Sequence, residues 1–143
     1  MTVRVGVIGT GWADRVLIPA FQAGGVEIAA VASRDVQRAR DVASRHGIEV
    51  ATGSWRDLLE IELDLIAVTS PPGLHREQAV AVLEAGRHLL CEKPLAVDAE
   101  AGEAILTAAR KGDGVLALVD HELRFAPARR KAKELIDSGA NFN

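Results

Sequence analysis

The sequence predicts an α/β protein with a three-layer, doubly wound parallel sheet, folded as a single domain over residues 1–143. Two observations predict this fold. Short apolar runs alternate along the chain with longer amphipathic segments, which is typical of helical crossovers that connect parallel strands. The chain is 48% hydrophobic but only 3% aromatic, so its apolar side chains are mostly the small aliphatic ones that suit closely packed strand and helix layers.

Six apolar runs are the expected strands, at residues 3–8, 27–32, 48–51, 63–69, 88–91 and 115–119. Continuous runs such as 65–68 are typical of parallel strands, which are buried on both faces. Right-handed crossovers then predict the strand order 3-2-1-4-5-6. In this order Gly9, Ser33, Thr69 and Glu92 all lie where strands end, along one edge of the sheet.

The amphipathic segments between these runs predict the helices. Asp35 suits the N-cap of a helix that ends at Gly47, where glycine can take the left-handed conformation. Ser54 and Asp57 resemble a weak capping box that opens a short helix. Pro19 falls inside the helix after the first strand and is expected to kink or split it. Further helices are expected over residues 74–85, 98–111 and 126–138.

Charge and composition argue against several classes of function. The formal net charge is −3, and the basic cluster at 129–133 lies on an amphipathic helix, so we interpret it as a solvated face and not a nucleic-acid site. No apolar run approaches ~20 residues, so no membrane span is expected. The single cysteine, Cys91, can form neither an intrachain disulfide nor a metal site alone, so we expect no metal and a reducing, cytoplasmic compartment.

The first motif with chemical meaning follows the first expected strand and opens a helix. It consists of Gly9, Thr10, Gly11, Trp12 and Ala13. Gly9 allows the tight turn, and Gly11 lets the backbone approach a pyrophosphate held at the helix N-terminus. Asp14 stands where a small residue is usual and brings a negative charge near that site. In this context the motif predicts a Rossmann-type dinucleotide site, with an ordinary glycine-rich turn as the alternative.

The end of the second strand carries the residues expected to choose between cofactors. Ser33 and Arg34 lie about 20 residues beyond the glycines, where an acidic residue would bind the ribose of NAD. A hydroxyl and a guanidinium suit a 2′-phosphate instead, and Arg38 can add a second positive charge one helical turn later. These residues favour NADP over NAD. The neighbouring acidic residue Asp35 leaves NAD as an alternative cofactor. The alternative interpretation of Arg34 is a solvated arginine at the end of a strand.

A proline-containing loop follows the fourth strand, at the edge where open α/β sheets bind ligands. It contains Thr69, Ser70 and Pro71, with His75 in the first turn of the next helix. Its prolines are expected to make the loop rigid. On the residues alone, His75 is either a residue of the cleft or an ordinary surface or packing residue.

The motif after the fifth strand consists of Glu92, Lys93 and Pro94. Two charged side chains at a strand end, stopped by proline, are expected to face the same crevice. Lys93 can then donate a proton or place a positive charge near the carbonyl group of a substrate. An exposed charged turn is the alternative. The sequence leaves the Lys93–Pro94 peptide bond open between cis and trans.

Together these motifs resemble the N-terminal domain of the glucose-fructose oxidoreductase, inositol dehydrogenase and rhizopine-catabolism family, written Gfo/Idh/MocA. The matching residues are 7–12, 32–34, 69–75, 92–94 and 124–127, in family order and spacing. The resemblance implies an NAD(P)-dependent oxidoreductase that transfers hydride between a nicotinamide and a sugar, polyol or diol-like substrate. It also implies that Lys93 is catalytic, that Glu92 and Pro94 position it beside the cofactor, and that His75 lines the cofactor cleft as a second catalytic candidate.

The resemblance further implies a second domain that forms most of the substrate pocket and that this sequence lacks. Residues 122–143 are expected to be the helix leading into it, so we expect a fragment without turnover of its own. A stand-alone module that binds or senses a dinucleotide is the alternative. The apolar face left bare by a missing domain is expected to favour homo-oligomers such as dimers.

Overall fold

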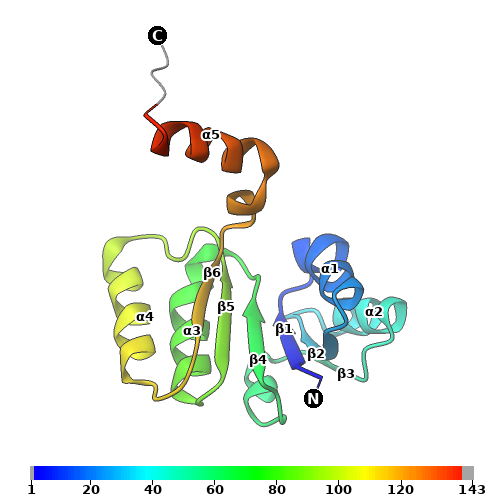
Figure 1. Ribbon diagram of the computed structural model, residues 1–143. Coiled ribbons are helices and arrows are strands. Elements are labelled where there is room, and N and C mark those ends of the chain that lie inside the picture. The colour runs from blue at the N-terminus through cyan, green and yellow to red at the C-terminus, as the bar shows by residue number, and fades with distance from the viewer. Residues whose placement is uncertain (1, 140–143) are drawn as a thin grey trace.

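The computed structural model describes residues 2–139, and its six strands form one parallel sheet. The strands are β1 (Arg4–Ile8), β2 (Glu27–Ala32), β3 (Val50–Thr52), β4 (Leu65–Val68), β5 (His88–Glu92) and β6 (Ala117–Asp120). Their order is β3-β2-β1-β4-β5-β6, which confirms the predicted order. Parallel pairing places the ends of all six strands at one edge, called the carboxyl edge below (Figure 1).

Helices cover both faces of the sheet, as a doubly wound fold requires. The main helices are α1 (Ile18–Ala23), α2 (Val36–His46), α3 (His75–Glu84), α4 (Ala99–Lys111) and α5 (Pro127–Asp137). On one face, α1 and α2 bury Ile18 and Val42 against the sheet residue Val7. On the other face, α3 and α4 bury Val82 and Ile105 in a second apolar cluster. The sheet is therefore enclosed by two separate cores, which confirms the predicted class.

The helix after β1 is divided at its proline, as expected. Residues Ala13–Leu17 form a π-helical turn, and the α-helical part begins at Ile18 with Pro19 in its first turn. Proline is tolerated there because the first amides of an α-helix have no partner within that helix. The π-helical turn places Ala13 and Leu17 in the core.

Helix capping follows the sequence at α2 but not after β3. The Asp35 side chain accepts hydrogen bonds from the backbone amides of Gln37 and Arg38, and Gly47 ends the helix with a φ of 67°. The predicted capping box between Ser54 and Asp57 is wrong, because Ser54 makes no side-chain cap. Asp57 accepts a hydrogen bond from the Thr52 hydroxyl instead, and the short helix over Trp55–Leu59 is of the 3₁₀ type.

The middle of the sheet is apolar, and it encloses the chain's single cysteine. Cys91 lies on β5 between Val68 of β4 and Val119 of β6, with no exposed surface. Burial, with a smaller contribution from the charge of Glu92, raises the pKa of the Cys91 thiol to about 12. The thiol is therefore protonated and inert in the folded protein.

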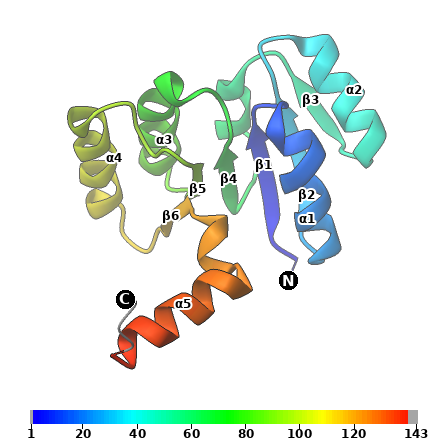
Figure 2. The same cartoon turned by 90° about the horizontal axis from the view of Figure 1, so that it is seen from above.

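The last strand and the last helix are much more exposed than the rest. Leu118 on β6 is 51% exposed, and α5 buries none of its residues. Figures 1 and 2 show α5 standing clear of the sheet beyond the carboxyl edge. Within the segment 122–143, residues 140–143 lie outside the described part of the chain. None of the helices described is both long and apolar enough to cross a bilayer.

Candidate cofactor site

A cleft of about 500 Å³ opens at the carboxyl edge, where β1, β2 and β4 end. Its volume falls in the usual range for small-molecule sites. The predicted residues that line it are Gly9, Thr10, Gly11, Ser33, Arg34, Arg38, Thr69, Ser70 and Pro71. The structure thus brings three motifs that are far apart in the sequence to one cavity.

Sequence reasoning missed several residues of this cleft. Trp55, which begins the 3₁₀ helix after β3, lies in its wall, as do Leu74 and Gln78. Gln78 is buried on α3 and accepts a hydrogen bond from the Ser70 hydroxyl. A glutamine among the apolar residues of a helix is the one signal that could have pointed to it, because a buried amide needs a partner.

The two glycines of the first motif have different surroundings. Gly9 has a φ of 103°, and a Cβ atom there would lie 2.8 Å from the Thr69 hydroxyl oxygen. Its amide donates to the carbonyl of Ala32 at 2.9 Å, so the turn is held between neighbouring strand ends. A Cβ atom on Gly11 would meet nothing within 4 Å. The fold therefore requires glycine at position 9. Gly11 leaves open space beside the backbone, which has room for a pyrophosphate.

The charged end of the cleft lies at the start of α2. Arg34 and Arg38 both line it and are both exposed, so their guanidinium groups are available to an anionic ligand. Ser33 is held close to the glycine turn, because its hydroxyl accepts a hydrogen bond from the Thr10 hydroxyl at 3.3 Å. Two guanidinium groups and a hydroxyl are the donors that bind phosphate groups well.

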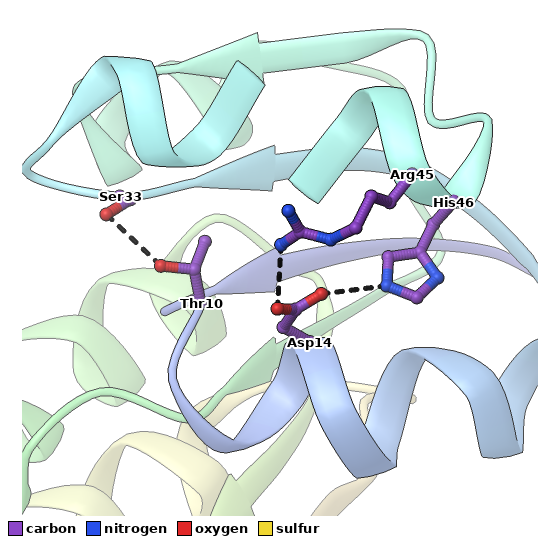
Figure 3. A network of polar contacts seen from close by, with 5 residues as sticks. All are labelled: Thr10, Asp14, Ser33, Arg45 and His46. Atoms are coloured by element: carbon purple, nitrogen blue, oxygen red, sulfur yellow. Dashed lines mark hydrogen bonds and ion pairs between the residues drawn. The ribbon is translucent and has the colours of Figure 1, made fainter. Parts of the chain in front are cut away.

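Asp14 does not carry an unpaired negative charge toward the glycine turn. Its carboxylate accepts hydrogen bonds from Arg45 at 2.7 Å and from His46 at 2.9 Å, both at the end of α2 (Figure 3). Burial raises the pKa of Asp14, but these two partners outweigh it and hold the pKa below its usual value. The small residue that packs the helix onto the sheet is Ala13, which is fully buried.

Trp12, Ala13 and His75 lie outside the lining of this cleft, as does the motif after β5. Ala13 is in the core, and Trp12 packs half-buried against the same core. His75 has no exposed surface. Its ring nitrogens lie 2.7 Å from the carbonyl oxygen of Ser70 and 3.0 Å from that of Pro94. The structure therefore does not place His75 in the cleft wall, where the sequence had expected it.

The motif after β5 lies at the same carboxyl edge but does not line the cleft. Lys93 is exposed, its Nζ atom lies 3.6 Å from the carboxylate of Glu122, and its bond to Pro94 is cis. Glu92 supports it, because one carboxylate oxygen accepts the Lys93 amide at 3.0 Å. The lysine thus lies at the same edge of the sheet as the cleft, with its exposed ammonium group facing Glu122.

Glu92 has a carboxyl neighbour that sequence reasoning missed. Asp120 on β6 pairs with it in the sheet register, and the second Glu92 oxygen is buried without a donor among the described residues. Burial and the adjacent Asp120 raise the pKa of Glu92, while the amide and charge of Lys93 lower it less. Only the strand pairing reveals this pair, since the two residues are far apart in the sequence.

The sequence that forms this cleft matches a known protein family. Residues 3–121 match the family described as oxidoreductases with an NAD-binding Rossmann fold, Gfo/Idh/MocA. The chain belongs to this family. It is an NAD(P)-binding Rossmann domain, as the motifs predicted.

Its curated relatives include dehydrogenases and reductases of sugars and polyols. A D-xylose 1-dehydrogenase (NADP(+)) from Haloferax volcanii is 39% identical over 93% of this chain and 41% of its own length. A 1,5-anhydro-D-fructose reductase from Ensifer adhaerens is 36% identical over 95% and 41%. A scyllo-inositol 2-dehydrogenase (NADP(+)) from Bacillus subtilis is 34% identical over 92% and 40%. The chain thus spans about two fifths of the length of these relatives.

Solved structures show the same fold. A 3-ketoreductase from Actinomadura kijaniata, in complex with TDP-benzene and NADP, superposes with a TM-score of 0.88 at 34% identity. The match covers 97% of this chain and 44% of that one. The WlbA dehydrogenase from Bordetella pertussis, in complex with NADH and UDP-GlcNAcA, gives a TM-score of 0.91 at 27% identity over 97% and 43%.

Proposed function

We propose that this chain is the cofactor-binding part of an NADP-preferring oxidoreductase that acts on a sugar, polyol or diol-like hydroxyl or its carbonyl form. The preference for NADP over NAD is inferred from the pair of exposed arginines, Arg34 and Arg38, at one end of the cleft. Two of the relatives above are named as NADP(+) enzymes, which supports it. The substrate class follows the names of the same relatives.

Each part of the cleft has a separate role in this proposal. The backbone at Gly9, Thr10 and Gly11 binds the pyrophosphate at the start of a helix, where amides have no partner. Ser33, Arg34 and Arg38 bind the 2′-phosphate by charge-assisted hydrogen bonds. Thr69, Ser70 and Pro71 form the facing wall, on the side nearer to Lys93.

We assign the chemistry on this chain to Lys93. A bound nicotinamide would supply or accept the hydride. In the reducing direction the Lys93 ammonium would donate its proton to the carbonyl oxygen, and in the oxidising direction the neutral amine would accept the proton of the hydroxyl. Glu92 fixes the backbone of Lys93 through the bond to its amide, and Pro94 ends the turn. His75 is a positioning residue in this proposal and not a catalytic one, because it is buried and both ring nitrogens face backbone carbonyls.

Calorimetric titration of the 143-residue chain with both cofactors tests the preference. We expect tighter binding of NADP than of NAD by about 10-fold, near the lower end of what one charge-assisted contact provides. Equal or reversed affinities would contradict the assignment of Arg34. Because Lys93 alone cannot hold a sugar at reacting distance, we expect negligible hydride transfer by these residues alone. Robust turnover in the same assay would contradict that expectation.

We also propose that the chain associates with a second copy of itself through the exposed apolar side chains of its last elements. Leu118, Phe125 and Ile136 are 51%, 70% and 62% exposed, which is unfavourable for a monomer in water. Light scattering at high concentration should give a dimer or larger mass, and Phe125→Asp should lower it. A monomeric mass for the unmodified chain would contradict the proposal.

The compartment proposed for this protein is the cytoplasm. Its one cysteine is buried and protonated, so nothing in the described fold depends on an oxidised thiol. Unchanged thermal unfolding of the purified chain in strong thiol reductant is the expected result. A large loss of stability in reductant would contradict it.

A further inference from the structure

Asp14 joins the two segments that carry the two phosphate-binding ends of the cleft. It lies at the start of the helix that follows the glycine turn. Arg45 and His46, its partners, are the last two residues of α2. The pair of contacts therefore connects the helix behind the pyrophosphate site to the helix that begins at the 2′-phosphate site (Figure 3).

Two more contacts join the same segments. The Gln22 amide, at the end of α1, donates to the backbone carbonyl of His46 at 2.7 Å, which gives one of the last carbonyls of α2 a partner. At the cleft itself, Thr10 bonds to Ser33 at 3.3 Å. The glycine turn with its helix and the α2 segment are thus tied at separate points, inside the cleft and away from it.

The charged groups at this contact are placed where each helix favours them. Asp14 lies in the first turn of its helix, near the positive end of the helix dipole, and Arg45 lies near the negative end of α2. His46 is a hydrogen-bond partner of the same carboxylate. The Asp14 and His46 side chains are 22% and 16% exposed, and that of Arg45 is 54% exposed. The hydrogen bond between Asp14 and His46 is therefore better shielded from solvent than the ion pair between Asp14 and Arg45.

We propose that Asp14 is a positioning residue for NADP, which sets the spacing between the pyrophosphate site and the 2′-phosphate site by holding α2 against the helix after the glycine turn. A ligand that reaches both sites gains from this spacing, because its second end binds to a group already in place. A ligand that occupies one site does not. The inference rests on the proposed function, since it requires the two ends of NADP to bind as assigned above.

The variants Asp14→Ala and Asp14→Asn in the 143-residue chain test this, with NADP and adenosine 2′-monophosphate as probes. The monophosphate carries the 2′-phosphate but no 5′-phosphate, so it reaches only the 2′-phosphate site. For Asp14→Ala we expect about 10-fold weaker binding of NADP, which is about 1.4 kcal/mol, and less than about 2-fold for the monophosphate. Asp14→Asn keeps a hydrogen-bonding side chain and should lose less.

Matched variants separate this role from general stability. Glu100→Ala removes another interhelical ion pair, the 3.1 Å contact of Glu100 with Arg76 between α4 and α3, and should leave binding of both probes unchanged. Arg45→Ala should reproduce much of the Asp14→Ala effect. The double variant of Asp14 and Arg45 should bind no more weakly than Asp14→Ala alone, because the two residues act through one contact.

Several results would overturn the inference. Tighter NADP binding by Asp14→Ala would mean that its charge acts mainly by repelling phosphate. Equal losses for NADP and adenosine 2′-monophosphate would show a purely structural role, and unchanged affinities would show none. If Asp14→Ala does not fold, Asp14→Asn and Arg45→Ala carry the same comparison. An unmodified chain that binds neither cofactor would overturn the proposed function itself, and this inference with it.

Discussion

The Nδ1 atom of His75 lies 3.0 Å from the carbonyl oxygen of Pro94, 19 residues further along the chain. The other ring nitrogen lies 2.7 Å from the carbonyl oxygen of Ser70. One buried ring therefore bridges the loop that lines the cofactor cleft and the loop that carries Lys93. A histidine in this place can affect both loops without touching a ligand.

The variant His75→Ala is expected to lower the free energy of unfolding by about 1–3 kcal/mol, because a fully buried ring and its hydrogen bonding to the backbone are lost. Urea denaturation measures this directly. His121→Ala is the control, since His121 is exposed, and it should change stability by less than about 0.5 kcal/mol. Unchanged stability in His75→Ala would contradict the bridging role.

The variant Arg34→Ala is expected to weaken NADP binding by about 10-fold and to change NAD binding by less than about 2-fold, since only NADP carries the 2′-phosphate. Arg40→Ala removes an exposed arginine of α2 that does not line the cleft, and it should affect neither cofactor. Calorimetry on both variants checks this. Equal losses of affinity for NADP and NAD would show that Arg34 does not bind the 2′-phosphate.

The two glycines of the turn should respond differently to alanine. Gly9→Ala should cost about 2 kcal/mol or more of stability, because of its positive φ and the close approach of Thr69. Gly11→Ala should fold with nearly normal stability, since its methyl group meets open space, and should bind NADP at least about 10-fold more weakly. Thermal unfolding and titration of both variants test this. A destabilised Gly11→Ala that still binds NADP would refute the division of roles.

Replacement of Asp120 by asparagine should change how stability depends on pH. The raised pKa of Glu92 means that the folded chain holds this proton more tightly than the unfolded chain does. Its stabilising contribution is present below the unfolded pKa and is lost as pH rises through the raised value. Asp120→Asn removes the repelling charge, so we expect about 0.2–1 kcal/mol more stability at neutral pH and no gain near pH ~3.

Urea unfolding at both pH values measures this difference. Asp113→Asn serves as the control, because Asp113 is an exposed carboxylate outside the Glu92 pair. A gain of equal size at acid and neutral pH would show that Asp120 acts on stability by some means other than the ionisation of its neighbour.

The fold and the cleft were predictable because their signals are local or follow chain order. Apolar runs and right-handed crossovers determine the strand order, and the order alone brings Gly9, Ser33 and Thr69 to one edge. The spacing of Arg34 behind the glycines likewise needs no tertiary information. The structure confirms the strand order and shows these residues around one cleft, while their roles toward a cofactor stay a prediction.

The remaining features depend on pairings between distant residues. From the sequence alone, the negative charge of Asp14 is unfavourable for phosphate binding at the glycine turn. The structure shows that this charge is paired with Arg45 and His46. Asp120 becomes a neighbour of Glu92 only through the pairing of β5 with β6. The failed capping box has the same cause on a smaller scale, because the carboxylate bonded the Thr52 hydroxyl instead of Ser54.

The burial of Cys91 makes the chain a reporter of its own opening motions. A thiol reacts with an alkylating reagent as the thiolate, and one with a pKa of about 12 in a closed sheet supplies almost none. Modification of the thiol therefore requires β5 to separate from β4 and β6. When the strands re-pair faster than the reagent reacts, the rate of modification follows the population of this open state. Saturating NADP, bound only by the closed form, should slow the labelling in proportion to its occupancy. A single mass shift, followed over time without any engineered probe, then measures how often the centre of the sheet comes apart.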